Sequence, residues 1–385
     1  MIARRRFVGG LIGSLLLPAV RLHSAPKATT IAAARSQGLA WLLSQQAGSG
    51  GWHSRTYGNL REGIGLTSLV LKAIASTGSQ VPDDAWQAAL AAGRRGVNFL
   101  MRRQDSHGLV CGPNGETDQP IYATALLLEA AAIVPEWELS ESLRAKLIAA
   151  LWDAQFGPAA GCQPKDEEFG GWGPLPPERS ARLPGDSANI AVTAHVLSVL
   201  RQYDALPEET NARARTFIDR CRGRDGFGFV PPADSPLNKA GMVESDGKPD
   251  VAAGYPSATC DGWLAMQATG LFASAELRQA FEQYLAMPLP SVAEDLPERA
   301  SRARQQLAGL WFYHAARASE VAKRISLPKL SQKREQLRER LLSQQQDNGS
   351  WQNAIATMRE DDPLVATSMA VIALQEMMPP EKVSP

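Results

Sequence analysis

The chain has 385 residues, of which 44% are hydrophobic and 21% are charged, and its formal net charge at pH 7 is zero. This is ordinary globular composition. Because there is no excess of basic residues, we expect no nucleic-acid partner. Beyond the N-terminal segment, no stretch approaches the ~18 apolar residues of a membrane span, which excludes a span in the mature chain.

The first 25 residues predict an export signal. Residues 4–8 spell Arg-Arg-Arg-Phe-Val, an apolar run follows over residues 9–20, and small residues occupy positions 24–25. A charged start, an apolar centre and a small-residue cleavage site are the parts of a signal peptide. The twin arginine favours the Tat route. We therefore expect an exported, periplasmic or extracytoplasmic protein; an ordinary Sec signal or an uncleaved anchor are the alternatives.

Helix pairs repeat along the rest of the chain. Apolar residues recur at i, i+3, i+4 and i+7 in most segments, and Gly or Pro marks nearly every junction. The pattern predicts six pairs of one outer and one inner helix, at 30–46 and 63–77, 85–104 and 120–133, 140–155 and 187–203, 208–222 and 255–271, 275–287 and 299–323, and 332–346 and 363–377.

Most of these pairs are joined by a turn that contains Gly and an aromatic residue. Strong copies span 45–52, 169–173 and 344–351, and weaker copies span 103–109 and 224–229. Gly supplies backbone freedom at a tight bend, and a Gln amide can satisfy backbone groups at a helix end. The indole ring packs over that end. We therefore assign Trp52, Trp172 and Trp351 a stabilising role and no chemistry.

The inner helices share a small-Thr-small phrase, centred on Thr67, Thr124, Thr193, Thr259 and Thr367. The place of a further copy, between the last two, is taken by residues 310–316 without the Thr. With these turns and phrases the chain resembles the prenyltransferase and squalene cyclase superfamily, whose "QW" motifs the Gln-to-Trp turns resemble. The resemblance implies an all-α fold, an α6-α6 toroid that forms one domain over 30–378. We expect residues 379–385 to be a disordered tail.

Residues that carry chemistry in such relatives are missing from their expected positions. Class II terpenoid cyclases carry an Asp-x-Asp-Asp run just before the inner Thr, and here the four residues before each Thr contain no carboxylate. Prenyltransferases bind zinc through Asp, Cys and His near the same point, and His314 alone does not make a three-ligand site. A metal site of His195, Cys260 and Asp261 is disfavoured, because Asp261 points roughly 200° away from Thr259 on a helical wheel. We expect no metal site there, and expect His195 and Asp261 to bond to outer helices or to each other.

We predict that the helix face holding the Thr residues lines a central cavity. That face continues four residues later, and an aromatic cluster joins it in the fifth pair. The predicted lining is Thr67, Leu71, Thr124, Leu128, Thr193, Leu197, Thr259, Trp263, Trp311, Tyr313, His314 and Thr367. Such a pocket suits an isoprenoid or lipid-like ligand. Alternatively, these side chains pack helix against helix.

Acidic residues precede several inner helices, among them Asp118, Asp186 and Asp362. Each can cap a helix, and because a toroid gathers the starts of its inner helices at one rim, together they are compatible with a divalent cation. No other cofactor is indicated. Two long loops, 156–186 and 223–254, are either lids or plain insertions.

The leading hypothesis is an exported toroid that binds an apolar small molecule, with catalysis by cyclase- or prenyltransferase-like chemistry left open. One alternative is a non-catalytic binding protein or an interaction scaffold with a protein partner. Another is an exported six-hairpin glycoside hydrolase or polysaccharide lyase, in which Asp118, Asp186 and Asp362 would supply the paired carboxylates.

Overall fold

The computed structural model describes residues 30–78, 80–112, 119–178, 180, 186–232, 234–243, 251–271, 274–325 and 328–378. The predicted signal peptide (1–25) and C-terminal tail (379–385) lie outside these residues. None of the described helices is long and apolar enough to cross a membrane.

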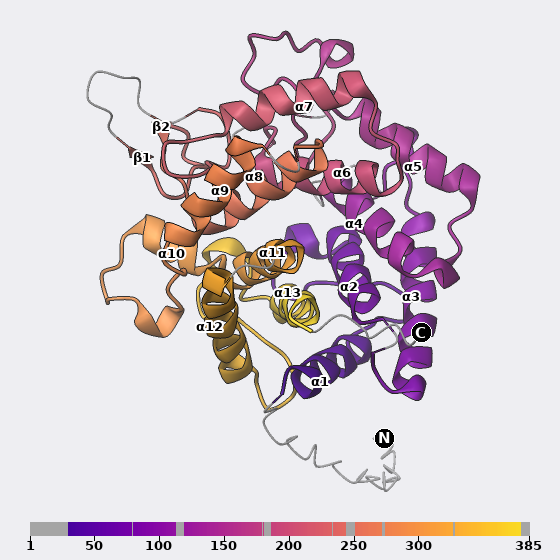
Figure 1. Cartoon of the computed structure of the whole chain (residues 1–385). Coiled ribbons are helices and arrows are strands. Elements are labelled where there is room, and N and C mark those ends of the chain that lie inside the picture. Colours follow the sequence, from indigo (N-terminus) through magenta and orange to yellow (C-terminus); the bar gives the residue numbers. More distant parts are fainter. Residues whose placement is uncertain are drawn as a thin grey trace, which may run out of the picture.

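Two rings of helices make up the fold (Figure 1). The inner ring comprises α2 (Ile64–Thr77), α4 (Pro120–Ile133), α6 (Ile190–Gln202), α8 (Pro256–Ala268), α11 (Trp311–Arg324) and α13 (Pro363–Glu376). The outer ring comprises α1 (Ile31–Ser44), α3 (Asp83–Met101), α5 (Glu141–Asp153), α7 (Glu208–Arg220), α9 (Ala275–Ala286) and α12 (Pro328–Gln344). Each inner helix packs on the next, and α13 packs on α2, which closes the ring. The predicted α6-α6 toroid is confirmed.

Smaller elements connect these helices. The described residues include α10 (Arg302–Ala308) and a two-stranded antiparallel hairpin of β1 (Met242–Val243) and β2 (Val251–Ala252). Short 3-10 turns occur at Gly58–Leu60 (η1), Pro135–Trp137 (η2), Pro158–Ala160 (η3), Ala293–Asp295 (η4) and Ala356–Met358 (η5).

The Trp turns tie each outer helix to its inner partner. In all three strong copies the indole Nε1 donates to a carbonyl near the end of the preceding outer helix, at 2.7–2.8 Å. The Trp backbone N–H donates to the Thr hydroxyl of the following inner helix, at 2.9–3.0 Å. These bonds satisfy groups that a helix end would otherwise leave unpaired. The Trp residues therefore have the structural contacts expected of a stabilising role.

The same turns also join neighbouring pairs. The amides of Gln46, Gln155 and Gln345 each donate to a carbonyl within their own turn and to a carbonyl of the next outer helix, at 2.8–3.0 Å. For Gln345 that second carbonyl belongs to Ala34 of α1. Because α1 begins the fold and Gln345 lies near its end, this bond contributes to closing the outer ring.

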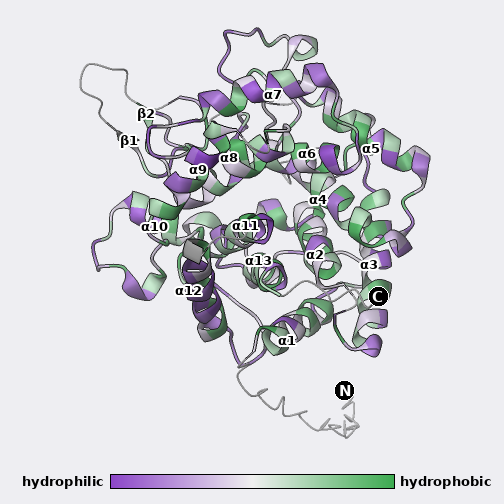
Figure 2. Cartoon of the chain, viewed as in Figure 1, coloured by the Kyte–Doolittle hydropathy of each residue, from purple (hydrophilic) through white to green (hydrophobic). Residues whose placement is uncertain are grey.

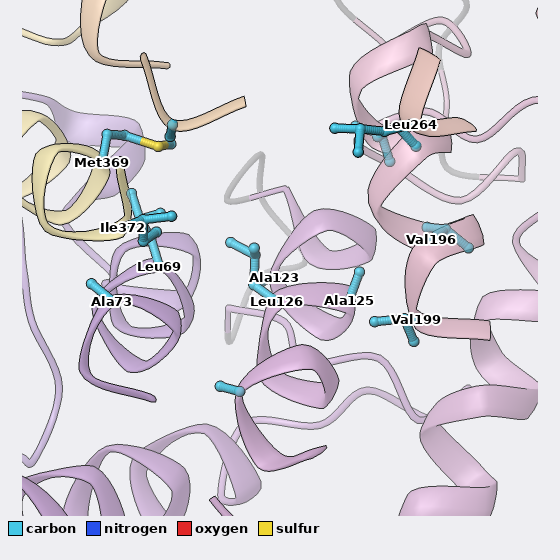
Figure 3. Close-up of a cluster of buried hydrophobic side chains, with 14 of the residues drawn as sticks. Leu69, Ala73, Ala123, Ala125, Leu126, Val196, Val199, Leu264, Met369 and Ile372 are labelled. Carbon is cyan, nitrogen blue, oxygen red and sulfur yellow. The ribbon is translucent and has the colours of Figure 1, made fainter. Parts of the chain in front are cut away.

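Apolar side chains fill the space between the inner helices. In Figure 2, α13 is mostly green, whereas α12 in the outer ring carries purple along much of its length. Figure 3 shows Leu69 of α2 with Ile372 of α13, and Val196 of α6 with Leu264 of α8, among side chains that are all buried. This burial is the main source of stability in helices of this length.

The fifth pair differs from the prediction. One inner helix was predicted over 299–323, but the chain divides at Gly309 into α10 and α11. The carboxylate of Glu360 accepts the backbone N–H groups of Phe312 (2.9 Å) and Tyr313 (2.7 Å), which fixes the start of α11. The other predicted helices are present within a few residues of their expected ends.

Candidate functional site

A cavity of about 400 Å³ lies inside the inner ring, at the end where the inner helices begin. Every inner helix contributes to its wall. The positions are regular: the residue two before the Thr of each phrase, or the matching residue of the fifth pair, always faces the cavity. These residues are Gly65, Tyr122, Ala191, Ser257, Tyr313 and Val365. The volume is within the usual range of small-molecule sites.

Residues two after the Thr lie one helical turn deeper. Leu69, Asp261 and Met369 reach the main cavity. A second space of about 20 Å³ lies next to it, and its wall shares Leu69, Tyr122, Tyr313 and Met369 with the main cavity and adds Leu126, His195 and Arg317. In the main cavity the wall from α2 and α13 is therefore apolar, whereas α8 and α11 contribute Asp261 and Tyr313. In the small space α2 also contributes a charged residue, Lys72.

The long loops border the cavity as well. Loop 156–186 contributes Pro174, and loop 223–254 contributes Phe229 and Lys239. Leu60 of η1 and Thr357 and Met358 of η5 also line the cavity.

The lining differs from the set predicted from the sequence. Of the twelve predicted residues, Tyr313 alone lines the main cavity in the described part of the chain. The five Thr hydroxyls instead accept a backbone N–H from the preceding turn, at 2.9–3.1 Å. Because residues two positions apart on a helix point about 200° apart, the Thr face is directed away from the hole.

The other predicted lining residues share this placement. Leu71, Leu128 and Leu197 are fully buried, as are Trp263 (3% exposed) and His314 (0%). Trp311 lies instead beside a separate polar cleft with Arg340 and Asn353. For these side chains, packing of helix against helix is the observed arrangement.

Asp261 is the carboxylate that the sequence reasoning placed off the Thr face. The single O–H of Tyr313 donates to the Asp261 carboxylate and lies 3.0 and 2.9 Å from the two oxygens, and Arg317 Nε donates to one of them at 2.6 Å. Arg317 also pairs with Glu320 (2.6 Å). Burial raises the pKa of Asp261, and the Arg317 guanidinium offsets part of that rise. Asp261 therefore meets a neighbouring inner helix, α11, rather than an outer helix or His195.

A second cluster of ionisable side chains lies inside the ring, beside the small space. Glu129 of α4 pairs with Lys72 of α2 (3.1 Å) and with His195 of α6 (3.2 Å). Burial alone would raise the pKa of Glu129, but Lys72 and His195 lower it well below its usual value. Together with the Asp261 cluster, these pairs account for the charges on the inner faces of α2, α4, α6, α8 and α11 at this level.

Three further charged groups line the cavity, namely Lys239, Arg359 and Glu360. Burial raises the pKa of Glu360 to about 8, while N–H donors at the start of α11 oppose that rise. Arg359 donates to the side-chain oxygen of Asn59 (2.6 and 2.8 Å). Lys239 is 7% exposed, and burial lowers its pKa to about 8.

The predicted rim carboxylates do not gather in the described residues. Asp362 caps α13 through the Leu364 N–H (2.9 Å) and accepts from Ser54. Asp186 is half-buried and outside the cavity wall, and Asp118 lies outside the described residues. No cluster of three or more His, Cys, Asp or Glu suited to a metal occurs in the described part of the chain. A divalent cation involving Asp118 stays an untested prediction.

No protein-family model matches the chain, and no curated protein matches it. Several solved structures, in contrast, are similar to this chain. The type II terpene cyclase MstE from Scytonema, in its apo form, matches with a TM-score of 0.55 at 14% identity, over 92% of this chain and 100% of the cyclase. This chain shares the cyclase's α/α-toroid fold. The same cyclase with its substrate, geranylgeranyl dihydroxybenzoate, matches with a TM-score of 0.54 at 14% identity, over 90% of this chain and 97% of the other.

An unrelated activity occurs on a similar fold. The GH76A alpha-1,6-mannanase from Salegentibacter sp. HEL1_6 matches with a TM-score of 0.55 at 10% identity, over 90% of this chain and 98% of the mannanase. The fold alone therefore does not distinguish an apolar ligand from a sugar. The choice has to be argued from the residues around the cavity.

Proposed function

We propose that the protein binds an isoprenoid or lipid-like molecule in its central cavity, outside the cytoplasm after export by its Tat-type signal. The observation that carries the proposal is the apolar half of the wall, where Leu66, Leu69, Val365 and Met369 face the hole from α2 and α13. Apolar surface enclosed in this way favours an apolar ligand. The terpene cyclase of the same fold has a geranylgeranyl-bearing substrate, which agrees with this choice.

The charged groups of the wall argue against the two catalytic alternatives. A glycosidase needs an acid and a base that are free to act. In the described residues, the two carboxylates of the wall are already occupied: Asp261 by Arg317 and Tyr313, and Glu360 by N–H donors. Cyclisation develops positive charge on the substrate, which the ammonium of Lys239 in the wall would oppose. Binding is therefore the activity that we propose, without turnover.

A cavity-filling variant tests the proposal. Ala191 of α6 lines the cavity, so Ala191→Trp should occupy part of it and weaken binding of geranylgeraniol by about tenfold or more, equivalent to ~1.4 kcal/mol. Ala88 is exposed on the outer helix α3, and Ala88→Trp is the matched control, expected to bind as the wild type does. Calorimetric titration measures both, and mass spectrometry of co-purified lipids identifies natural ligands.

Two results would reject this function. One is equal affinity of the two variants for geranylgeraniol. The other is a wild-type protein that binds oligosaccharides and does not bind geranylgeraniol, with the oligosaccharide binding lost in Ala191→Trp.

A further inference from the structure

We infer that the ligand of the cavity carries an anionic head, of the carboxylate class, and that Lys239 binds it. The inference rests on the proposed function, because it specifies the polar end of the same apolar ligand. Lys239 lies in loop 223–254, and its side chain is buried at the cavity wall.

The ammonium of Lys239 has weak partners, and the Asp261 carboxylate acts on it only from beyond ion-pair distance, opposing part of the effect of burial on its pKa. Its Nζ donates to the Leu237 carbonyl (3.2 Å) and the Tyr255 hydroxyl (3.4 Å), both long contacts. It also lies 3.8 Å from the centre of the Phe229 ring, an attractive cation–π arrangement. Among the described residues, no carboxylate lies within ion-pair distance. A buried ammonium without a paired anion is costly, so a bound anion would stabilise it.

The other charged groups of the wall do not compete for this role. Asp261 has its own guanidinium in Arg317, and Glu360 accepts N–H groups at the start of α11. Arg359 is half-buried and donates to Asn59, so its charge adds to the positive potential of the cavity. The positive charge of Lys239 is therefore the buried one that remains for a ligand.

The loop holds Lys239 in place. The neighbouring Asn238 is 4% exposed, and its side-chain oxygen accepts the N–H groups of Phe229 (2.7 Å) and Val230 (3.1 Å). Its amide nitrogen donates to the carbonyls of Val230 (3.2 Å) and Pro232 (2.6 Å). Both sides of the amide thus fix the loop, so that Lys239 and Phe229 face the cavity in a defined arrangement before a ligand arrives, which lowers the ordering cost of binding.

The test compares two probes that share one chain and differ in the head, geranylgeranoic acid and geranylgeraniol. Lys239→Met removes the charge at similar length, and Lys239→Arg keeps it. We expect Lys239→Met to weaken binding of the acid by about tenfold or more, as loss of a buried charge partner does, and to change binding of the alcohol by less than about threefold. Lys239→Arg should retain a preference for the acid. Thermal melting of each variant confirms that it is folded.

A pH series gives a second readout that does not depend on the folding of Lys239→Met. Wild-type affinity for the acid should fall as the pH rises through about 8, where Lys239 loses its proton. Glu360 ionises near the same pH, burial holds the pKa of the Tyr255 hydroxyl well above its usual value, and Asp261 and Arg359 are the other charged groups of the wall. Lys239→Arg separates these effects, because arginine stays charged and only the smaller contribution of Glu360 remains.

The outcomes separate the two proposals. If the wild type and Lys239→Met bind the acid equally while both bind the alcohol, the inference about Lys239 is wrong and the proposed function stands. If the wild type binds neither probe, the proposed function fails and this inference fails with it. A tenfold loss for both probes in a folded Lys239→Met would assign Lys239 a structural role and also overturn the inference.

Discussion

The threonine of the inner phrase acts as a hydrogen-bond acceptor at the same place in five helix pairs. In the third pair, Thr193 accepts the backbone N–H of Trp172 at 3.0 Å, and both residues are fully buried. A turn that crosses from an outer to an inner helix has N–H groups with no helical partner, and a hydroxyl on the adjacent helix supplies one. The repeated Thr thus has a structural explanation that directs it away from the cavity.

Replacing that hydroxyl should cost stability without touching the ligand site. Thr193→Val keeps the shape of the side chain but leaves the Trp172 N–H buried and unbonded, which we expect to lower the free energy of unfolding by about 1–3 kcal/mol. Thr193→Ser keeps the acceptor and should lose less. Urea unfolding measures both. The interpretation would be wrong if the Val variant were as stable as the Ser variant, or if it lost ligand affinity.

At the level of single residues, the sequence predicted the phrase but assigned the wrong face to the cavity. The regular positions were available: counting two residues before and after each Thr finds Tyr122, Asp261 and Met369. Lys239 gave no such signal, because it lies in a loop with no periodicity and only the folded arrangement brings it to the wall. Its burial could not have been inferred from its neighbours in the chain.

Each Gly turn depends on a backbone conformation and on close approach to the next outer helix. Gly170 has φ +93°, and a Cβ there would lie 1.9 Å from the carbonyl oxygen of Arg213 in α7. Gly50 and Gly349 also have a positive φ, and a Cβ there would lie 2.7 and 2.8 Å from a carbonyl oxygen of the next outer helix, which is less severe but still too close. Two independent reasons therefore favour glycine at this position: the positive φ, and the lack of space for a Cβ.

A pair of Gly→Ala variants separates those two requirements. Gly161 has φ +74° with nothing within 4 Å of an added Cβ, so Gly161→Ala should lower stability by only the cost of the left-handed conformation, about 1–2 kcal/mol. Gly170→Ala adds an overlap with α7 and should lower it by about 2–5 kcal/mol. Chemical denaturation compares them, and equal losses would show that contact with α7 contributes nothing.

For the elements, helix periodicity and the Gly-Trp turns were sufficient to predict the number, order and approximate ends of the paired helices. The break in the inner helix of the fifth pair was not predicted, because the residue that caps α11, Glu360, lies nearly fifty residues further along the chain. A contact between residues so far apart in the chain forms only in the folded ring, so the local sequence pattern of the fifth pair cannot predict it.

Closure of the ring makes the two ends of the chain interdependent across the whole molecule. The Gln345 amide bonds to Ala34 of α1 (2.9 Å) in the same way that the Gln155 amide bonds to Thr210 of α7 (3.0 Å). The first is a bond between the ends of the fold and the second is a bond within it. In an open array, repeats contact only their neighbours, and a weakened end frays locally.

In a closed ring, weakening either bond should destabilise the whole molecule. Gln345→Ala and Gln155→Ala each remove two buried hydrogen bonds of the amide nitrogen and should each lower the free energy of unfolding by about 1–3 kcal/mol. Hydrogen exchange should then accelerate by similar factors in α6 and in α13 for both variants, because opening at the seam and opening inside the ring release the same cooperative unit. Faster exchange confined to α1 and α13 in Gln345→Ala, with α6 unchanged, would instead mean that the helix pairs behave as an open array whose ends merely touch.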